Sequence, residues 1–241
     1  METVAILICA HNEEAYIGRT IDLIHRTGLN FNHNLDLIVV NDGSTDKTSK
    51  IARERGARVV DLPKNVGKAN AFFAGIKEAL KREPVALVTV DADMIRVPRR
   101  GLSNLIIKAK KATGKGRTKM IVSGVYESSM MQKAHVPQVG YLGSGIRSFS
   151  TPALHFLTHS KAKKFAKGYG LESFLDILLK ERRVSIRNFG FIAEQAARTA
   201  KSKKQVEDLW QTRKKERQIR KYSRTGPLAA SQPKRSTRHI K

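Results

Sequence analysis

Short apolar runs alternate with segments of helical periodicity through the first half of the chain. The apolar runs predict strands, which we place at Val4–Ala10, Leu35–Val40, Ala57–Leu62, Val85–Val90 and Lys119–Val125. The segments between them carry apolar residues at helical spacing and predict helices at Glu13–Arg26, Thr45–Arg55, Gly67–Lys81 and Arg99–Ala112. Strands that alternate with helices are typical of βαβ units. We therefore expect an α/β fold with a mostly parallel sheet and helices on both faces.

The second half of the chain is less regular, and it sets the expected domain limits. We expect an extended segment, a helix and a late strand at Gly140–Phe149, Leu171–Arg182 and Val184–Phe189. The sequence from about Ile192 to Tyr222 is typical of a polar helix, and the apolar content is low after it. The predicted organisation is one domain over residues 1–190, a basic helical extension over 191–222 and a disordered basic tail over 223–241.

The formal net charge of +25 over 241 residues predicts an anionic partner, such as nucleic acid, an acidic membrane or a phosphorylated substrate. The single cysteine, Cys9, excludes an internal disulfide and a cysteine-based zinc site. The N-terminal apolar run is too short for a signal peptide, and acidic residues flank it. No run approaches the roughly 18 apolar residues of a membrane-spanning helix. We expect a cytoplasmic protein, or one that contacts the membrane surface from the cytoplasmic side.

Much of the charge lies in the predicted C-terminal extension. Residues 201–241 carry fourteen Lys or Arg and three acidic residues. A thin apolar stripe of Val206, Leu209, Trp210 and Ile219 makes the helix weakly amphipathic, and a basic amphipathic helix can lie on an anionic membrane. A solvated charged helix is the commoner structure for so narrow a stripe. Nucleic acid is disfavoured as a partner, because the chain has no nucleic-acid-binding motif and little aromatic interleaving.

Polar loops follow each of the first four predicted strands. They contain the sequences "AHNEE", "NDGSTD", "PKNVGKAN" and "DADM". Ligands of open parallel sheets bind at the carboxyl ends of the strands, so these loops are expected to converge on one binding site. Asp42 in the second loop can accept hydrogen bonds from a base or ribose, or it can serve only the turn, with Ser44 or Thr45 capping the next helix.

The fourth loop places two carboxylates directly after an apolar strand. Asp91 and Asp93 are two residues apart, so in extended backbone they point the same way. Hard oxygen ligands of this kind suit Mg²⁺ or Mn²⁺, which bind through one or two carboxylates plus substrate phosphates. The alternative is a solvated loop. No G-x-G-x-x-G follows the first strand, and no G-x-x-x-x-G-K-[ST] occurs, which argues against a nicotinamide dehydrogenase and a P-loop nucleotidase.

The four loop motifs, in this order and at these spacings, resemble the family 2 glycosyltransferases of the GT-A (Rossmann-like) fold over about residues 3–125. The resemblance implies transfer of a sugar from a nucleoside-diphosphate sugar of the UDP or GDP type. It also implies a role for the matching residues. Glu13 matches an acid that contacts the nucleotide, and Asp42 matches the aspartate that contacts the uracil or guanine edge. His11 stands where a tyrosine commonly packs by the base, and Cys9 replaces a proline.

The same resemblance covers the metal and the diphosphate. Lys68 matches the lysine of an "N-x-G-K" loop that lies near the donor. Asp91 and Asp93 match the D-x-D pair, in which the second aspartate is the usual direct ligand of the metal on the diphosphate. A divalent ion there neutralises the charge of the leaving group. The resemblance therefore implies Mg²⁺ or Mn²⁺ as the cofactor.

A weaker resemblance over about residues 140–190 concerns the acceptor. The segment "GSGIRSFS", with Ser144 and Arg147, resembles one that closes over the sugar and the acceptor. Glu172 in "GYGLES" matches an acid that faces the acceptor and is the candidate base, although it would also favour the N-terminus of the helix that starts near Leu171.

Two subgroups fit these segments. One is the inverting polyprenyl- or dolichyl-phosphate sugar synthases. The other is the retaining glucosyl-3-phosphoglycerate synthase type, which uses a downstream histidine near the metal; after Phe189 this chain has only His239. We expect a glycosyltransferase whose anionic acceptor is a polyprenyl or dolichyl phosphate. The alternatives are retaining transfer to phosphoglycerate, and a non-catalytic basic module that binds nucleic acid or membrane.

Overall fold

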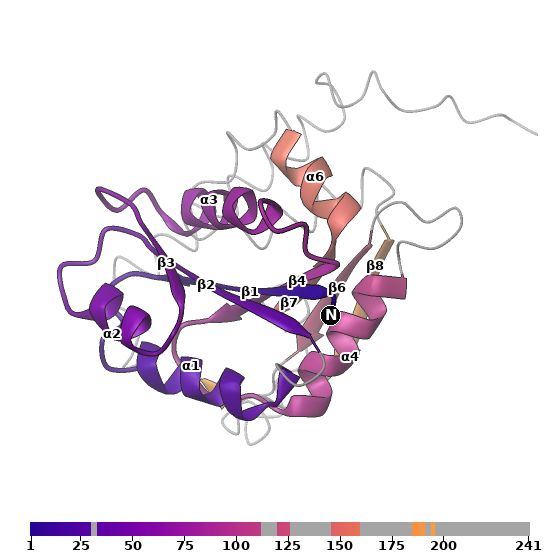
Figure 1. The fold of residues 1–241 in the computed structure, drawn as a ribbon, viewed down its shortest axis with the longest axis horizontal. Coiled ribbons are helices and arrows are strands. Elements are labelled where there is room, and N and C mark those ends of the chain that lie inside the picture. The colour runs from indigo at the N-terminus through magenta and orange to yellow at the C-terminus, as the bar shows by residue number, and fades with distance from the viewer. Residues whose placement is uncertain (30–32, 112–119, 126–145, 160–184, 191–193, 196–241) are drawn as a thin grey trace, which may run out of the picture.

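A computed structural model describes residues 1–29, 33–111, 120–125, 146–159, 185–190 and 194–195. Within these residues, one seven-stranded sheet is covered by helices on both faces (Figure 1). The strands of the sheet are β1 Thr3–Ala10, β2 Asn34–Asn41, β3 Arg58–Asp61, β4 Ala86–Asp91, β6 Met120–Val125, β7 Arg147–Ser150 and β8 Ser185–Gly190. Their spatial order is β3-β2-β1-β4-β7-β6-β8.

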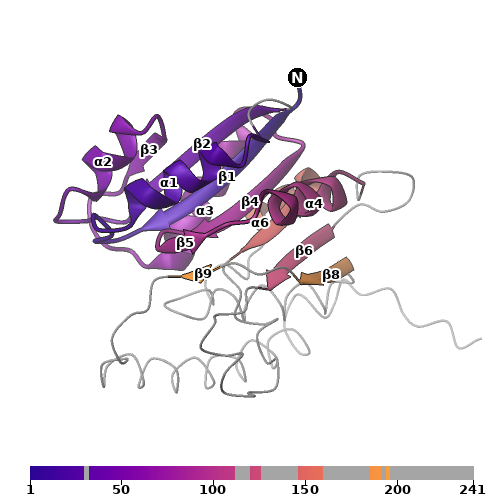
Figure 2. The ribbon, with the colours of Figure 1, turned by 90° about the horizontal axis from the view of Figure 1, so that it is seen from below.

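Strands β3, β2, β1 and β4 run parallel to one another. Strand β7 is antiparallel to both of its neighbours, β4 and β6, whereas β6 and β8 are parallel. The predicted mostly parallel sheet is therefore confirmed. A second, two-stranded sheet pairs β5 (Met94–Arg96) with β9 (Glu194–Gln195), and Figure 2 shows it beside the carboxyl end of β4.

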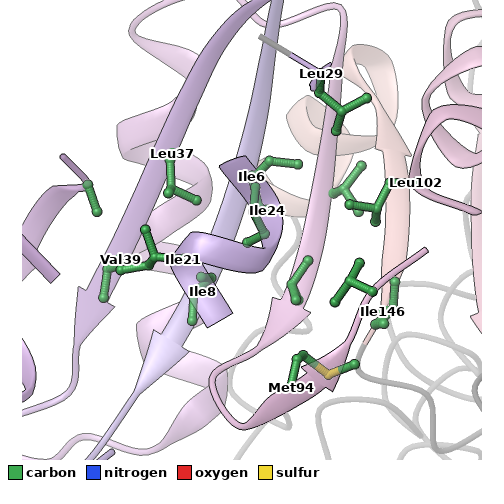
Figure 3. Close-up of a cluster of buried hydrophobic side chains, with 14 of the residues drawn as sticks. Ile6, Ile8, Ile21, Ile24, Leu29, Leu37, Val39, Met94, Leu102 and Ile146 are labelled. Atoms are coloured by element: carbon green, nitrogen blue, oxygen red, sulfur yellow. The ribbon is translucent and has the colours of Figure 1, made fainter. Parts of the chain in front are cut away.

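The helices form two layers. Helices α1 (Ile17–Arg26), α2 (Thr48–Glu54) and α4 (Arg99–Lys110) cover one face of the sheet, and α3 (Lys68–Leu80) and α6 (Thr151–His159) cover the other (Figure 1). Successive strand residues point to opposite faces, so β1, β2 and β4 each contribute to two apolar clusters. On the α1 side, Ile6 and Ile8 of β1 pack with Ile21 and Ile24 of α1 (Figure 3).

The opposite cluster fixes the position of α3. Phe72 of α3 packs against Phe149 of β7, with ring centroids 5.6 Å apart. A Cβ atom added at Gly75 would lie 2.3 Å from a methyl carbon of Leu7, so α3 lies directly on β1. Because β1 is a central strand, this close packing holds the first residue of α3, Lys68, at the carboxyl edge of the sheet.

Most predicted elements are present with shifted ends, but some predictions were wrong. The first helix starts at Ile17 rather than Glu13, because Glu13 to Tyr16 form a hydrogen-bonded turn. The expected polar helix from about Ile192 is contradicted at Glu194–Gln195, which pair with β5 as a strand. Elements β5 and α6 were not predicted. The expected helix over residues 171–182, most of the C-terminal extension and the tail lie outside the described residues.

Candidate functional site at the carboxyl edge of the sheet

The strand register brings the four polar loops together. Cys9 of β1 is level with Val40 of β2 and with Asp91 of β4. One residue further along, Ala10 pairs with Asn41, which in turn pairs with Asp61 of β3. The four parallel strands therefore end nearly level, and the loops that follow them start from one edge, as the sequence predicts.

The loops after β1 and β2 are joined by hydrogen bonds. The Asn12 amide donates to Ser44 Oγ at 3.0 Å, and the Thr45 amide donates back to Asn12 Oδ1 at 2.9 Å. The Glu13 amide donates to Thr48 Oγ1 at 2.8 Å. Asn12 has a φ of 54°, a conformation that asparagine adopts more readily than most residues. These contacts fix the backbone of Glu13.

Asp46, rather than Ser44 or Thr45, caps the helix that follows β2. Its carboxylate accepts from the backbone amides of Thr48 at 2.9 Å and Glu14 at 3.1 Å, so the predicted cap was wrong and α2 starts at Thr48. Burial tends to raise the pKa of Asp46, but the hydrogen bonds from Thr48 and Glu14 outweigh it and lower that pKa. The hydroxyls of Ser44 and Thr45 are used in the contact with Asn12 instead.

Asp42 connects the second loop to the third. Its buried carboxylate accepts from the backbone amides of Val66 at 2.8 Å and Gly67 at 2.9 Å. Its own carbonyl oxygen lies 2.8 Å from Nδ1 of His11, and a carbonyl can only accept, so that nitrogen carries the proton. Asp42 thus links three loops through its side chain and its backbone.

Two further residues of this edge were missed by sequence reasoning. Asn41 donates from Nδ2 to Asp61 Oδ1 at 2.8 Å and accepts from the Ser44 amide at 3.1 Å. Burial tends to raise the pKa of Asp61, but hydrogen bonds from Arg53, Asn41 and Ser49 outweigh it and lower that pKa. Asn41 and Asp61 are each a polar residue at the end of an apolar strand, and this sequence pattern could have indicated both as residues of the site.

Lys68 and Asp91 form an ion pair between the third and fourth loops. Lys68 Nζ lies 3.1 Å from Asp91 Oδ1, and the two side chains are 38% and 15% exposed. Asp93 follows in a turn between β4 and β5 and is only 6% exposed. The edge therefore holds two carboxylates and one ammonium group at the end of a central strand.

These carboxylates fit the metal that the sequence predicts. No group of three or more His, Cys, Asp or Glu side chains that could hold a metal ion occurs among the described residues. A site closed entirely by protein side chains is thus absent from that part of the chain. Mg²⁺ and Mn²⁺ do not need one, because one or two carboxylates with substrate phosphates and water complete their coordination. Asp91 and Asp93 are the carboxylates of the right type at this edge.

Arg147 lies on the same face of the sheet as Asp91. It is 2% exposed and pairs in register with Thr89 of β4. Because opposed residues in antiparallel strands share a face, and Asp91 is two residues beyond Thr89, Arg147 and Asp91 are diagonal neighbours on the α3 side. Ser144 and Glu172, the other residues predicted to act on the acceptor, lie outside the described residues.

The sheet order and the D-x-D turn at the carboxyl edge agree with a GT-A-like fold. Residues 5–116 match the sequence model of Glycosyl transferase family 2. It is 37% identical over 92 residues to an uncharacterized protein of Methanocaldococcus jannaschii, covering 38% of this chain and 36% of that protein. It is 35% identical over 100 residues to 4,4'-diaponeurosporenoate glycosyltransferase of Staphylococcus aureus, covering 39% of this chain and 25% of that enzyme.

Solved structures extend the likeness in fold over most of the chain. Glucosyl-3-phosphoglycerate synthase of Mycobacterium tuberculosis, in complex with Mn²⁺, UDP and glucosyl-3-phosphoglycerate, superposes with a TM-score of 0.60. The match covers 92% of this chain and 80% of that chain at 22% identity, and it establishes the GT-A fold. A complex of the same enzyme holds Mg²⁺ and UDP. None of the helices among the described residues is long and apolar enough to cross a membrane.

Proposed function

We propose that this chain is a metal-dependent glycosyltransferase, which moves a sugar from a nucleoside-diphosphate sugar to an anionic acceptor. The observation that carries the proposal is the ion pair of Lys68 and Asp91 beside buried Asp93, at the edge where the family motifs meet. An ammonium group and carboxylates that suit a divalent cation are the groups that a diphosphate requires. The similarity to 4,4'-diaponeurosporenoate glycosyltransferase supports the reaction class, and the match spans 25% of the length of that enzyme.

The nucleotide would bind over the loops that follow β1 and β2. Both oxygens of Asp42 already accept from the loop amides of Val66 and Gly67. Each carboxylate oxygen has a second lone pair, so Asp42 retains the capacity to accept from the N–H of a base. His11 is held by its Nδ1 and keeps Nε2 and its ring face for the nucleotide. Glu13, whose backbone is fixed by Thr48, would contact the nucleotide as its motif implies.

The transfer breaks the bond between the anomeric carbon and the β-phosphate oxygen, and the electron pair leaves with the nucleoside diphosphate. A bond from the anomeric carbon to an acceptor oxygen forms. A Mg²⁺ or Mn²⁺ ion held by Asp91 and Asp93 would supply Lewis-acid neutralisation of the diphosphate. Lys68 and Arg147 would add fixed positive charge at the same edge.

Two classes of acceptor are candidates for this reaction. A polyprenyl or dolichyl phosphate agrees with the basic C-terminal extension, which would meet an anionic membrane. Phosphoglycerate agrees with the solved structures that are similar in fold. A phosphate oxygen of the polyprenyl lipid attacks without a base, whereas a hydroxyl acceptor needs one to take its proton, a role for which Glu172 is the candidate. Ser144 and Arg147 are the candidates for holding the acceptor phosphate.

The test is a donor screen by thermal shift with UDP- and GDP-sugars and Mn²⁺, followed by mass spectrometry of products with each acceptor. We expect a rise in melting temperature with one donor, and a product whose mass exceeds that of one acceptor by a single sugar residue. Asp93→Asn should lower the transfer rate by about 100-fold, whereas Asp22→Asn, at a surface ion pair with Arg55, should not. Shifts with RNA or anionic vesicles but with no nucleotide would instead support a non-catalytic basic module.

A further inference from the structure

The fully buried hydroxyl of Thr20 contacts the D-x-D turn from the face of the sheet that α1 covers, opposite to the face that α3 covers. Thr20 lies in α1, and its Oγ1 is 2.7 Å from the Ala92 carbonyl oxygen and 3.0 Å from the Met94 amide nitrogen. A longer contact of 3.5 Å joins it to the Met94 carbonyl. The first two partners are the residues immediately before and after Asp93.

The direction of both hydrogen bonds follows from the partners. A carbonyl oxygen only accepts and a backbone amide only donates, so the hydroxyl of Thr20 donates to Ala92 and accepts from Met94. One hydroxyl group therefore fixes the two peptide groups that flank Asp93. Because the turn between β4 and β5 contains only Ala92 and Asp93, these two contacts set the direction in which the Asp93 side chain leaves the backbone.

Helix α1 is a rigid support for this contact. Ile17, Ile21 and Ile24, which share the buried face of α1 with Thr20, are completely buried. The Met94 side chain is buried in the same cluster, and Figure 3 shows it at the end of that cluster, near the start of β5. The turn is thus held to the core by the Met94 side chain and to α1 by the Thr20 hydroxyl.

We propose that Thr20 is a positioning residue for the metal: its hydroxyl holds the Ala92–Met94 backbone so that Asp93 presents its carboxylate to a divalent cation. The inference rests on the proposed function, since it concerns the same pair of carboxylates. A partner that orients a metal ligand without touching the metal typically changes metal affinity by 10- to 100-fold when it is removed. Nothing in the family motifs includes Thr20, which lies outside all four loops.

The test compares Thr20→Val, which has the same shape without the hydrogen bonds, with Thr20→Ser, which retains the hydroxyl. Thr27→Val is the matched control, because Thr27 is another buried threonine next to α1, and its hydroxyl donates to the carbonyl of Ile24 rather than to the D-x-D turn. The Kd for Mn²⁺ is measured in saturating UDP from the loss of the free-Mn²⁺ electron paramagnetic resonance signal. The affinity for UDP without metal is measured beside it.

We expect Thr20→Val to raise the Kd for Mn²⁺ by about tenfold, with UDP affinity unchanged in the absence of metal. Thr20→Ser and Thr27→Val should keep the wild-type Kd. If Thr20→Val does not fold, Thr20→Cys, with a weak thiol donor, replaces it under the same criteria. A folded Thr20→Val variant that binds Mn²⁺ as tightly as wild type overturns this inference alone. A wild-type protein that takes up no Mn²⁺ with UDP overturns the proposed function as well.

Discussion

The ammonium nitrogen of Lys68 lies 3.1 Å from Oδ1 of Asp91, and the pair joins the first residue of α3 to the last residue of β4. Close packing of Gly75 on Leu7 fixes the helix, and the sheet fixes the strand, so the pair is set by the fold. A lysine and a divalent cation compete for the same carboxylate oxygen. Once a diphosphate is bound, the lysine can contact the phosphate instead, and the competition ends.

This relationship predicts opposite effects of Lys68→Met on metal and on nucleotide. The affinity for Mn²⁺ alone should rise, because Asp91 loses its competing partner. The affinity for UDP in saturating Mn²⁺ should fall by about tenfold, close to the loss of one hydrogen bond to a charged group. Isothermal titration calorimetry measures both constants, with Lys64→Met, an exposed lysine of the same loop, as the control. Changes of the same sign in both affinities would contradict the competition.

Gly43 is required at the contact between the second and third loops for two reasons. Its φ is 65°, and a Cβ atom there would lie 2.3 Å from the backbone carbonyl carbon of Lys64. Gly43→Ala should therefore cost about 2–4 kcal/mol in the free energy of unfolding, the sum of left-handed strain and overpacking. Gly56→Ala separates the two causes, because Gly56 also has a positive φ but nothing within 4 Å of its Cβ position.

The Gly56 variant should cost only about 1–2 kcal/mol. Urea denaturation measures the loss of unfolding free energy in each variant. The loss in Gly43→Ala minus the loss in Gly56→Ala is the cost of the steric contact alone. Equal losses at the two positions would show that the Lys64 backbone can move away, and that the close contact of the two loops is not needed. Donor binding should fall only in the Gly43 variant, since that loop contact also brings the amides of Val66 and Gly67 to Asp42.

The sequence predicts the strands and the edge of the site well, and the contacts between loops poorly. Apolar runs locate β1, β2 and β4 within a residue or two, because burial on both faces demands them. Parallel topology then places Asp42, Lys68 and Asp91 at one edge. No local pattern reveals that Thr20 holds the Asp93 turn from 72 or more residues away, or that Asp46 takes the capping role expected of Ser44 or Thr45.

The opposite end of the sheet carries a buried charge network, which should affect stability and not the site. Asp36 is 3% exposed and accepts from Arg58 at 3.1 and 2.7 Å and from Arg82 at 3.3 Å. The hydrogen bond to Asp36 is the main cause that raises the pKa of Arg58. Asp36→Ala should cost about 1–3 kcal/mol in the free energy of unfolding, because it removes a buried, hydrogen-bonded carboxylate and leaves Arg58 with Glu78 as its remaining acidic partner.

Arg82→Ala is the control for that variant, since Arg82 is half-exposed and should cost at most about 1 kcal/mol. Denaturant unfolding measures both losses. The Kd for UDP with Mn²⁺ should be unchanged in each folded variant, because the network lies at the opposite ends of the strands from Asp42 and Asp91. A loss of nucleotide affinity in the Arg82 variant would mean that the two ends of the sheet are coupled.

Asp61 makes stability depend on pH. Hydrogen bonds from Arg53, Asn41 and Ser49 outweigh burial and keep its pKa below the ordinary value when the protein is folded. A carboxylate with a lowered folded pKa binds its proton more weakly in the folded state, so its stabilisation is complete above the unfolded value of about 3.9 and is lost as pH falls through the folded value. The difference in unfolding free energy between wild type and Asp61→Asn should therefore be constant above about pH 5 and shrink from about pH 4 downward. Urea denaturation at a series of pH values measures that difference. A difference in unfolding free energy that stays constant below about pH 4 would mean that Asp61 stabilises the fold through its shape rather than through its charge.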